Sequence, residues 1–520
     1  MRSLVRSLRR ISQVLVFAVF MFLFLNTEYK DSDVLPYAVN VFLRMDPLVA
    51  GTAALAGRAL IELLWPALAV AGLTVLIGRF FCGWACPMGS VIDLVDAAAF
   101  ARLRRKKAVP DGWRRYKYLV LFFLAASSLF TLQLVFLMDP ISLLIRSFTL
   151  AVYPAANVAI NGTFDTLYNT SYRPVTAVSE PVYSFLKAHF LAFYQPHYRL
   201  AGLIGLIFIA ILALEYYQRR FWCRNLCPLG ALLGILGRFG IVRRRVSEPD
   251  CIGCGICEKR CRMGAVGEDF RATDRGDCIM CMDCRALCPE RAVRFTGGHR
   301  AVGAALGVSR RSMLSSIALG VAAVPVLASG GYRVAPNQKL IRPPGALPED
   351  EFLARCTRCG ECMRVCIANG LQPSLFEAGL AGLWSPVLVP RIGYCEYNCT
   401  LCGQVCPTGA VKRLVPAEKK KIKIGLAEID RSHCLPWKGD SDCIVCEEHC
   451  PTGDKAIKLR EEKVVTMFGE TKSFKRPYVD EKLCVGCGIC ETKCPLTDRA
   501  AIAVTSRGES RAAPPDYSPG

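Results

Sequence analysis

The chain has 520 residues, of which 52% are hydrophobic, and it carries 28 cysteines and a formal net charge of +21. Its length leaves room for several domains, and its hydrophobic share is high for a soluble protein. The positive charge could indicate nucleic-acid binding, but the basic residues lie beside apolar segments, which favours a membrane protein anchored by Lys and Arg. The sequence contains no P-loop and no C-x2-C-H motif for covalent haem.

Five apolar segments are predicted to span a membrane, because each has close to the roughly 20 residues that a helix needs to cross a bilayer. They are residues 11–27, 58–78, 118–138, 200–217 and 313–329. None of the five histidines lies in these segments, so paired ligands for a membrane haem b are lacking.

Basic residues set the predicted orientation of these spans. Arg and Lys precede the first span, fill the loop between the second and third, and follow the fourth. Since such residues accumulate on the cytoplasmic side, we expect residues 82–117 and 218–312 in the cytoplasm together with the N-terminus. Residues 330–520 are then expected in the periplasm, outside a bacterial inner membrane.

Two stretches at span ends form an internal repeat. "RFFCGWACPMG" covers residues 79–89 and "RFWCRNLCPLG" covers residues 220–230. Two such units with parallel topology predict a pseudo-two-fold axis along the membrane normal. That axis would bring four thiols together around one further metal centre, and a structural turn with reduced thiols is an equal alternative. The four residues are Cys82, Cys86, Cys223 and Cys227.

The segment between these two stretches, residues 139–199, is long and apolar but too interrupted for another continuous span. We interpret it as amphipathic helices on the outer membrane surface. Packing against the four-helix bundle and a wall of a quinone pocket are the alternative roles for it.

The remaining cysteines form six groups with the spacing C-x2-C-x2-C-x3-C-P of two-cluster ferredoxins, or close to it. Three cysteines on a tight loop bind one [4Fe–4S] cube and the fourth reaches the other cube, so the predicted ligand sets are crossed. In residues 241–300 the sets are Cys251, Cys254 and Cys257 with Cys288, and Cys278, Cys281 and Cys284 with Cys261. In residues 331–520 they are Cys356, Cys359 and Cys362 with Cys406; Cys395, Cys399 and Cys402 with Cys366; Cys434, Cys443 and Cys446 with Cys494; and Cys484, Cys487 and Cys490 with Cys450.

Two of these groups depart from the plain spacing, with three residues after Cys395 and eight after Cys434. Zinc is an alternative, but its sites use two separate C-x2-C halves rather than four cysteines in one run. Gly255, Gly360 and Gly488 are expected to let the backbone bend around sulfur.

At residue 309 the chain reads "SRRSMLSSIALGVAAVPVLASGG", which has the form of a twin-arginine export signal in an unusual internal position. We expect residues 305–330 to be a signal or anchor helix. Export of a folded domain suits iron–sulfur clusters, because cluster binding is coupled to folding. Alternatively, Arg310 and Arg311 act only as cytoplasmic anchors.

With these motifs, residues 1–300 resemble NapH-type membrane ferredoxins, and residues 305–520 resemble NapG/MauM-type periplasmic ferredoxins. The resemblance implies two proteins joined in one chain, with four membrane spans and two cysteine motifs in residues 1–240. The expected fold is an α-helical bundle of four spans plus an anchor helix, with α+β ferredoxin-like two-cluster domains on both sides.

The resemblance also implies a quinol dehydrogenase component that passes electrons from the quinone pool, through six [4Fe–4S] clusters, to a periplasmic reductase or cytochrome. Two alternatives stay open: a copper-type metal reductase or maturation factor, and a transmembrane conduit fed by a cytoplasmic ferredoxin. Nucleic acid is not an expected partner, and no catalytic residue can be named.

Overall fold

The computed structural model describes residues 2–30, 33–35, 37–100, 103, 110–169, 173–192, 194–298, 307–328, 338–465 and 471–512. The predicted domain boundaries near 300–305 and 330, and the basic residues 104–107, lie outside the described residues. The predicted boundaries therefore stay predictions.

The chain forms two compact units that do not follow its order in sequence. Unit 1 consists of Met1–Asn26, Val39–Ala151 and Gly202–Val326. Unit 2 consists of Thr27–Ala38, Val152–Ala201 and Leu327–Gly520. Two segments from the N-terminal half thus belong to the unit that contains the C-terminal cysteine groups.

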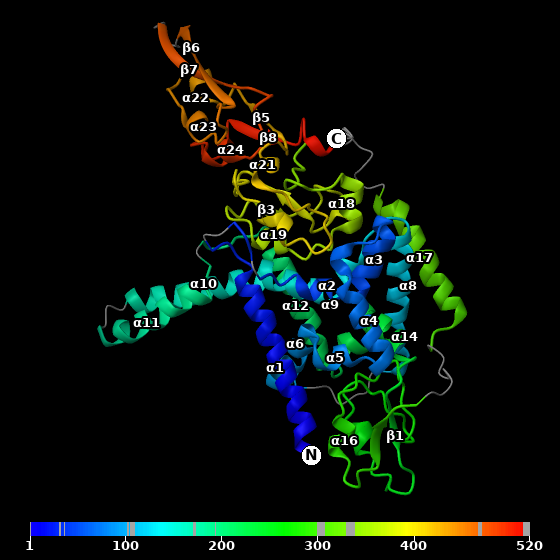
Figure 1. The fold of residues 1–520 in the computed structure, drawn as a ribbon. Helices are drawn as coiled ribbons and strands as arrows, with labels where there is room; N and C mark the ends of the chain where they lie inside the picture. Colours follow the sequence, from blue (N-terminus) through cyan, green and yellow to red (C-terminus); the bar gives the residue numbers. More distant parts are fainter. Residues whose placement is uncertain are drawn as a thin grey trace. The chain divides into compact units, whose positions relative to one another are not determined.

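Unit 1 is a bundle of apolar helices with a small ferredoxin-like fold of two strands and two short helices (Figure 1). Its longer helices are α1 (Arg2–Asn26), α3 (Pro47–Gly57), α4 (Pro66–Ile77), α8 (Tyr116–Leu129), α9 (Pro140–Ser147), α12 (Ala201–Ala213), α14 (Pro228–Gly237) and α17 (Arg310–Ala328). Helix α14 packs against α3, α4 and α8, and α1 packs against α5 (Phe80–Trp84) and α6 (Pro87–Val95).

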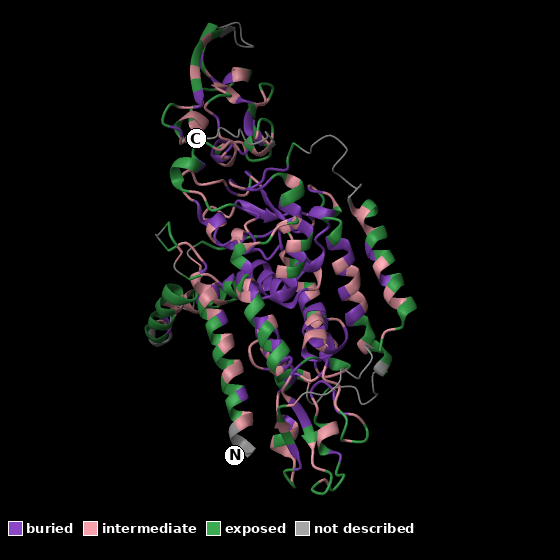
Figure 2. Ribbon diagram, turned by 45° about the vertical axis from the view of Figure 1, so that its right-hand side comes forward, coloured by how far each residue is buried: buried purple, intermediate pink, exposed green. Residues whose placement is uncertain are grey.

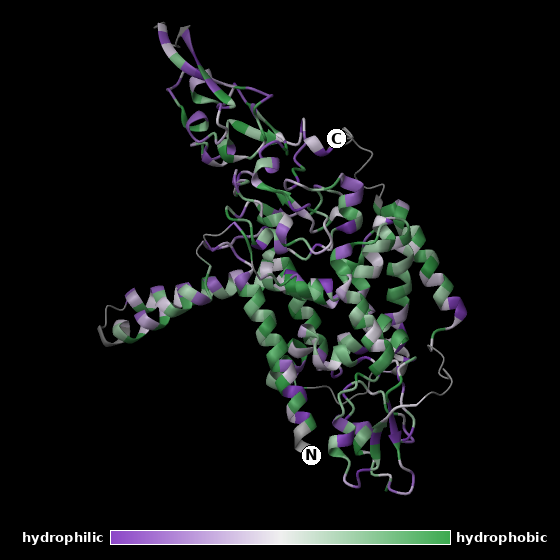
Figure 3. Cartoon of the chain, viewed as in Figure 1, coloured by the Kyte–Doolittle hydropathy of each residue, from purple (hydrophilic) through white to green (hydrophobic). Residues whose placement is uncertain are grey.

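The outer faces of α1, α12 and α17 are apolar and exposed (Figures 2 and 3). Examples are Val14 in α1, Leu206 in α12 and Leu319 in α17, whose exposed fractions are 69%, 65% and 64%. Exposed apolar faces of this kind suit contact with lipid. Three helical segments of the described chain are long and apolar enough to cross a membrane, namely Val5–Asn26, Pro140–Asn169 and Arg310–Leu327.

Three predictions about the spans need correction. The predicted span 118–138 ends early, because α8 ends at Leu129 and Thr131 takes a left-handed conformation with φ of 66°. The predicted span 58–78 is broken, because Arg58 takes a left-handed conformation with φ of 48° after α3, and α4 begins only at Pro66. The segment 139–199 is not too interrupted for a long helix: α9, a π-helical turn at Phe148–Val152 and α10 (Tyr153–Asn169) follow one another without a break. The polar and small residues that interrupt its apolar run do not interrupt the helix.

The anchor helix α17 packs closely on α8. A Cβ atom added at Gly320 would lie 2.5 Å from the Phe123 carbonyl oxygen, so only glycine allows this approach. The Ser316 hydroxyl donates a hydrogen bond to the Leu119 carbonyl oxygen at 2.6 Å. The predicted signal segment is therefore an integral helix of unit 1.

The ferredoxin fold of unit 1 follows α14 directly. Strand β1 (Arg243–Val246) pairs antiparallel with β2 (Val293–Thr296), with Arg243 opposite Thr296. Between them lie the short helices α15 (Ile256–Lys259) and α16 (Asp283–Leu287), one in each cysteine group. This α+β arrangement matches the predicted two-cluster domain type.

Unit 2 combines two helices from the N-terminal half with three more two-stranded sheets. Helix α10 packs against α11 (Arg173–His189). The strands are β3 (Leu371–Pro373) with β4 (Pro386–Leu388), β5 (Leu426–Ile429) with β8 (Ile502–Thr505), and β6 (Ile457–Val465) with β7 (Thr471–Val479). The short helices are α18 (Glu349–Arg355), α19 (Glu361–Arg364), α20 (Leu401–Gln404), α21 (Pro416–Lys419), α22 (Leu435–Lys438), α23 (Val445–Glu448) and α24 (Ile489–Lys493).

The N-terminal segments are built into the core of unit 2. Tyr29, Leu35 and Ala38 pack on the buried core of Val365, Leu401 and Val405. Polar contacts from the same segments add to this packing. Leu35 N–H donates to Gln404 Oε1 at 3.2 Å, and the Tyr198 hydroxyl donates to the Met363 carbonyl oxygen at 3.3 Å.

Candidate iron–sulfur sites

Five cavities in the structure are each lined by four cysteines. In unit 1, cavities of about 380 Å³ are lined by Cys251, Cys254, Cys257 and Cys288, and by Cys261, Cys278, Cys281 and Cys284. In unit 2, cavities of about 420, 410 and 340 Å³ are lined by Cys366, Cys395, Cys399 and Cys402; by Cys434, Cys443, Cys446 and Cys494; and by Cys450, Cys484, Cys487 and Cys490. Each of these sets takes three cysteines from one group and the fourth from its neighbour.

A sixth set gathers Cys356, Cys359, Cys362 and Cys406. The Cys362 thiol interacts electrostatically with the other three, so the four lie close together. Cys395 and Cys434, the two cysteines with unusual spacing, stand in their predicted sets. The structure brings the predicted ligands together, and the binding of a cluster by each set stays a prediction.

The local backbone explains how these sets form. Gly255, Gly360 and Gly488 each cap a short helix in the left-handed region, with φ of 66°, 87° and 84°. Met282 takes the same role in the second group of unit 1 with φ of 58°, a conformation that only a minority of non-glycine residues adopt. This turn points successive thiols into one cavity.

Backbone N–H groups point at the fourth cysteine of several sets. Ala265 N–H donates to Cys261 Sγ at 3.3 Å, Val411 N–H to Cys406 Sγ at 3.4 Å, and Ala501 N–H to Cys494 Sγ at 3.4 Å. Such hydrogen bonds stabilise anionic sulfur and tune the reduction potential of a cluster. They fit thiolates bound to iron.

Burial raises the pKa of Cys366, Cys446 and Cys487 to about 12, because an apolar cavity disfavours the thiolate. Bound iron would supply the positive charge that such thiolates need. Within the described ranges, no three His, Cys, Asp or Glu side chains are placed to hold a single metal ion. Three cysteines from one group and one from its neighbour around a shared cavity are the ligand pattern of [4Fe–4S] cubes.

The four thiols of the internal repeat also come together, in unit 1. Cys86 and Cys227 precede Pro87 and Pro228 as the N-caps of α6 and α14. The Cys227 thiol interacts electrostatically with those of Cys223, Cys82 and Cys86. Gly230 N–H donates to Cys227 Sγ at 3.2 Å. The binding of a metal by this thiol quartet stays a prediction.

The arginine of each repeat packs against the glycine of the other repeat. A Cβ atom added at Gly230 would lie 2.7 Å from Arg79 Nη2, and one added at Gly89 would lie 3.4 Å from Arg220 Nη2. Both arginine side chains are fully buried. This exchange explains why the repeat contains Arg and Gly as well as cysteine, and it agrees with a pseudo-two-fold relation.

The thiol quartet shares a hydrophobic core with the second cluster site of unit 1. Cys82 and Cys223 pack against Met263, Ala265 and Ile279, and so do Cys261, Cys278 and Cys281 of that site. The backbone of the first cysteine motif lies close to that of the cluster site, since a Cβ atom added at Gly83 would lie 2.3 Å from the Ile279 carbonyl oxygen. Trp84 Nε1–H donates to the Met280 carbonyl oxygen at 3.0 Å.

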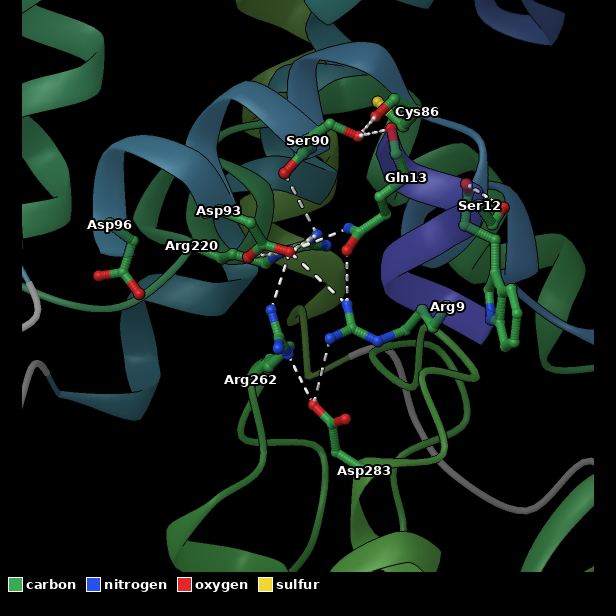
Figure 4. A network of polar contacts seen from close by, with 12 residues as sticks. Arg9, Ser12, Gln13, Cys86, Ser90, Asp93, Asp96, Arg220, Arg262 and Asp283 are labelled. Carbon is green, nitrogen blue, oxygen red and sulfur yellow. Dashed lines mark hydrogen bonds and ion pairs between the residues drawn. The ribbon is translucent and has the colours of Figure 1, made fainter. Parts of the chain in front are cut away.

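Two buried ionic networks hold the ferredoxin fold on the bundle. In the first, Arg220, Arg262 and Arg9 converge on Asp93, at 2.8, 2.8 and 3.7 Å, and Arg262 also pairs with Asp283 at 2.6 Å (Figure 4). Arg262 and Asp283 belong to the ferredoxin fold, whereas the other three residues belong to the bundle.

The second network centres on Asp277, which pairs with Lys117 and lies 3.6 Å from Arg79 and 3.7 Å from Arg114. Burial alone would raise the pKa of Asp277, but Lys117 and Arg79 hold it below its usual value. A buried carboxylate surrounded by three cations needs all of them in place. The second cluster site of unit 1, which contains Cys278 and Cys281, is therefore held rigidly beside the thiol quartet.

One pair of functional candidates was missed from the sequence. Asp46 and Asp139 are fully buried in unit 1. Both stand in the tripeptide Met-Asp-Pro, at residues 45–47 and 138–140. The repetition of this tripeptide, once before each cysteine motif of the internal repeat, is the signal that could have revealed them.

Comparison with known proteins supports these assignments. Residues 60–109 and 198–247 match a family described as a 4Fe-4S binding domain, and residues 477–496 match a second family of the same description. Each of the first two ranges contains one cysteine motif of the internal repeat. No solved structure matches the chain.

Three relatives illustrate the breadth of the similarity. Uncharacterized protein MJ0749 of Methanocaldococcus jannaschii is 25% identical over 230 residues, which cover 43% of this chain and 67% of the relative. The methylamine utilization ferredoxin-type protein MauM of Methylorubrum extorquens is 41% identical over 140 residues, which cover 25% of this chain and 62% of MauM. Protein NirI of Paracoccus denitrificans is 28% identical over 229 residues, which cover 44% of this chain and 27% of NirI.

The chain is an iron–sulfur, ferredoxin-type electron transport protein with apolar membrane helices. It is related to NirI and MJ0749 and similar in part to MauM. The chain spans less than two thirds of MauM and of NirI. Its many C-x2-C motifs are sites for [4Fe–4S] clusters.

Proposed function

We propose that the chain oxidises quinol in a bacterial inner membrane and passes the electrons through [4Fe–4S] clusters to a reductase or cytochrome in the periplasm. The observation that carries this proposal is the core shared by the thiol quartet and the cluster site of Cys261, Cys278 and Cys281. A membrane-soluble donor meets the protein in its membrane unit, and there the redox sites lie beside apolar helices.

The thiol quartet is proposed to hold an additional iron–sulfur centre. Cys82, Cys86, Cys223 and Cys227 come from two ranges that both match a 4Fe-4S binding family. Arg79 and Arg220 are buried beside the quartet, and Arg79 Nη2 lies 3.9 Å from Cys82 Sγ. Their positive charges would offset the negative charge of four thiolates.

Six cubes in the other cysteine sets would bring about 24 iron atoms per chain, at four irons per cube. When bound, the clusters supply one-electron carriers. The chain's own residues then position the clusters. The left-handed turns direct the thiols into each cavity. The ionic networks of Asp93 and Asp277 fix the second cluster site of unit 1 on the helix bundle.

The proposal is tested by mixing the purified, oxidised protein with reduced quinones of low and high potential. We expect the visible absorbance of the clusters to bleach, and an inhibitor of quinone sites to prevent it. If both quinones leave every cluster oxidised while dithionite reduces them, the chain does not oxidise quinol.

The role of the thiol quartet is tested by Cys82→Ser and Cys223→Ser. We expect either change to abolish bleaching by quinol while the six cubes stay assembled, as shown by iron content. Ser127→Ala is the matched control, because this buried hydroxyl of α8 donates its hydrogen bond to the Leu124 carbonyl oxygen within the same helix. Wild-type rates in both cysteine variants would assign the motifs to structural turns.

A second candidate function is a conduit from a soluble cytoplasmic ferredoxin. It is favoured by Cys254, which is exposed, so the cluster site of Cys251, Cys254, Cys257 and Cys288 reaches the surface. Bleaching by a reduced ferredoxin, together with none by either quinol, would support the conduit.

A further inference from the structure

Asp46 and Asp139 begin two apolar helices of unit 1 in the same way. Asp46 Oδ1 accepts hydrogen bonds from the N–H groups of Leu48 and Val49 at 2.7 and 3.2 Å. Asp139 Oδ2 accepts one from Ser142 N–H at 2.7 Å. In each case proline follows at the first helical position, which is where a helix tolerates it best.

The two aspartates belong to the same internal repeat as the cysteine motifs. Helix α14, which follows the second cysteine motif, packs against α3, which Asp46 caps. Helix α6, which follows the first cysteine motif, packs against α9, which Asp139 caps. Each half of the repeat thus exchanges contacts with the other, as Arg79 and Arg220 do.

The exchange brings the two carboxyl groups into contact. Both residues are 0% exposed, and the elements next to them meet: the helix Val41–Arg44 before Asp46 packs against α9, and the turn Val135–Leu137 before Asp139 packs against α3. The two carboxyl groups are close enough to interact with each other. Asp46 Oδ2 and Asp139 Oδ1, the oxygens not used in capping, have no hydrogen-bond donor among the described residues. Two carboxylates cannot bond without a proton, and two buried like charges repel. The buried pair is therefore expected to share one proton.

The surroundings add polar groups to an otherwise apolar region. The positive charge of Arg146 acts on Asp139, and the Arg146 Nη1–H donates to the Phe136 carbonyl oxygen at 3.0 Å. Ser142, Arg146 and Thr149 are 0%, 2% and 1% exposed, and they recur on the Asp139 face of the helix. Thr149 Oγ1 is buried without a hydrogen-bond partner in the described chain.

Helix capping alone does not explain this arrangement. Ser or Asn caps a helix as well as Asp does, and neither brings a buried negative charge. Ionisable groups enclosed by membrane helices are costly and mark proton or ion sites by default. What distinguishes the pair is its ability to hold one or two protons.

We propose that Asp46 and Asp139 together form a proton-binding site that takes up a proton as an electron enters the membrane unit. The identity of the electron donor rests on the proposed quinol oxidation. In that reaction quinol gives quinone, two electrons and two protons, and the electrons pass singly to the iron–sulfur sites. For each electron that quinol gives up, the singly protonated pair accepts one of the protons from quinol. The pair then releases this proton to water before the next electron is transferred.

Charge balance supplies the physical reason. An electron added to an apolar interior brings a negative charge whose burial is unfavourable. With one shared proton, the pair has one negative charge beside the positive charge of Arg146. A second proton neutralises the pair and offsets the added electron, so reduction and proton uptake favour each other.

The test compares the double variant Asp46→Asn/Asp139→Asn with the wild type in the full chain. Asn keeps both helix caps and a hydrogen bond between the two side chains, but it cannot bind the extra proton. We expect unchanged iron content and unchanged bleaching by dithionite, with bleaching by quinol slowed about 100-fold, at the low end for a positioned proton acceptor. Asp165→Asn, which changes an exposed aspartate of α10, is the matched control.

Infrared difference spectra of the wild type give a second readout that does not depend on a variant folding. Reduction by dithionite should produce a band of a protonated carboxyl group that shifts in D2O, and each single variant should lack it. A wild-type spectrum without this band overturns the proposal, as does quinol oxidation at the wild-type rate in the double variant. If quinol never reduces the protein but the band appears with dithionite, the proton site stands and the quinol function fails.

Discussion

The exchanged arginine–glycine contacts lead to a prediction about two glycines at equivalent positions of the repeat. In Gly230→Ala the new methyl group would lie 2.7 Å from Arg79 Nη2. Arg79 cannot easily move away, because its Nη1–H donates to the Gly276 carbonyl oxygen at 2.6 Å and its guanidinium pairs with Asp277. In Gly89→Ala the closest atoms, Cys82 O and Arg220 Nη2, would be 3.3 and 3.4 Å away, which is tight but tolerable.

The two magnitudes follow from opposing effects. Overpacking a buried site costs about 1–3 kcal/mol. The 2.7 Å contact at Gly230 is shorter than a real Cβ contact, so its cost lies in the upper part of that range, about 2–3 kcal/mol. Replacing glycine by alanine inside a helix recovers up to about 1 kcal/mol. We therefore expect Gly230→Ala to destabilise unit 1 by about 1–2 kcal/mol and Gly89→Ala to leave it nearly unchanged.

The assay is thermal denaturation of the purified protein, followed by loss of cluster absorbance in matched detergent. At roughly 2–4 °C for each kcal/mol, Gly230→Ala should lower the apparent melting temperature by about 2–8 °C. An equal or larger decrease in Gly89→Ala would refute the reasoning, because the two sites would then not differ in their contact with arginine. An unchanged Gly230→Ala protein would refute it as well.

Three further predictions concern the clusters, the ferredoxin fold and the membrane topology. Cys288→Ser should remove the cluster held with Cys251 and leave its neighbour intact, which electron paramagnetic resonance of the reduced protein would show; loss of the neighbour instead would contradict the crossed sets. Asp277→Asn should destabilise the attachment of the ferredoxin fold by about 3–5 kcal/mol, because it leaves buried cations unpaired. Since the pKa of Asp277 is held below its usual value of about 3.9, its contribution is complete above that pH and is lost only as the pH falls through its lower, folded-state pKa. Acid titration of protease resistance measures it, and loss already at pH 6 would contradict the assignment. Arg310→Lys/Arg311→Lys should prevent export of a periplasmic reporter fused after residue 512, whereas normal export would leave the pair as a topological anchor only.

The cysteine sets were the most predictable part of the site. Their spacing is a local property in four of the six groups, because three thiols within seven residues can meet only on one tight turn. The partner of each trio was also accessible, since the fourth cysteine, such as Cys288, has a fixed place after the third in this class of fold. The structure adds that an eight-residue spacer after Cys434 forms α22, whose Trp437 packs against β7 through the Pro477 carbonyl oxygen.

What the sequence did not reveal depends on contacts between distant segments. The exchange of Arg79 with Gly230 and the meeting of Asp46 with Asp139 require the two halves to pack together, and no local pattern encodes that packing. The helix Pro140–Asn169 was missed because polar and small residues interrupt its apolar run, yet buried polar groups such as Arg146 are satisfied inside unit 1. Hydropathy alone treats every such residue as an interruption.

The composition of unit 2 has a consequence for the order of assembly. Its core includes Tyr29 and Leu35, and a buried contact joins Arg364 to Glu28 at 3.4 Å. A C-terminal domain that folds around its clusters before export would therefore lack part of its own interior. Under the proposed topology, its final docking takes place after translocation, on segments that were inserted into the membrane earlier. Where such parts are made as two polypeptides, this step is a bimolecular encounter. In one chain it is intramolecular, at an effective concentration on the order of millimolar, so each membrane unit receives one electron-transfer domain however scarce the protein is.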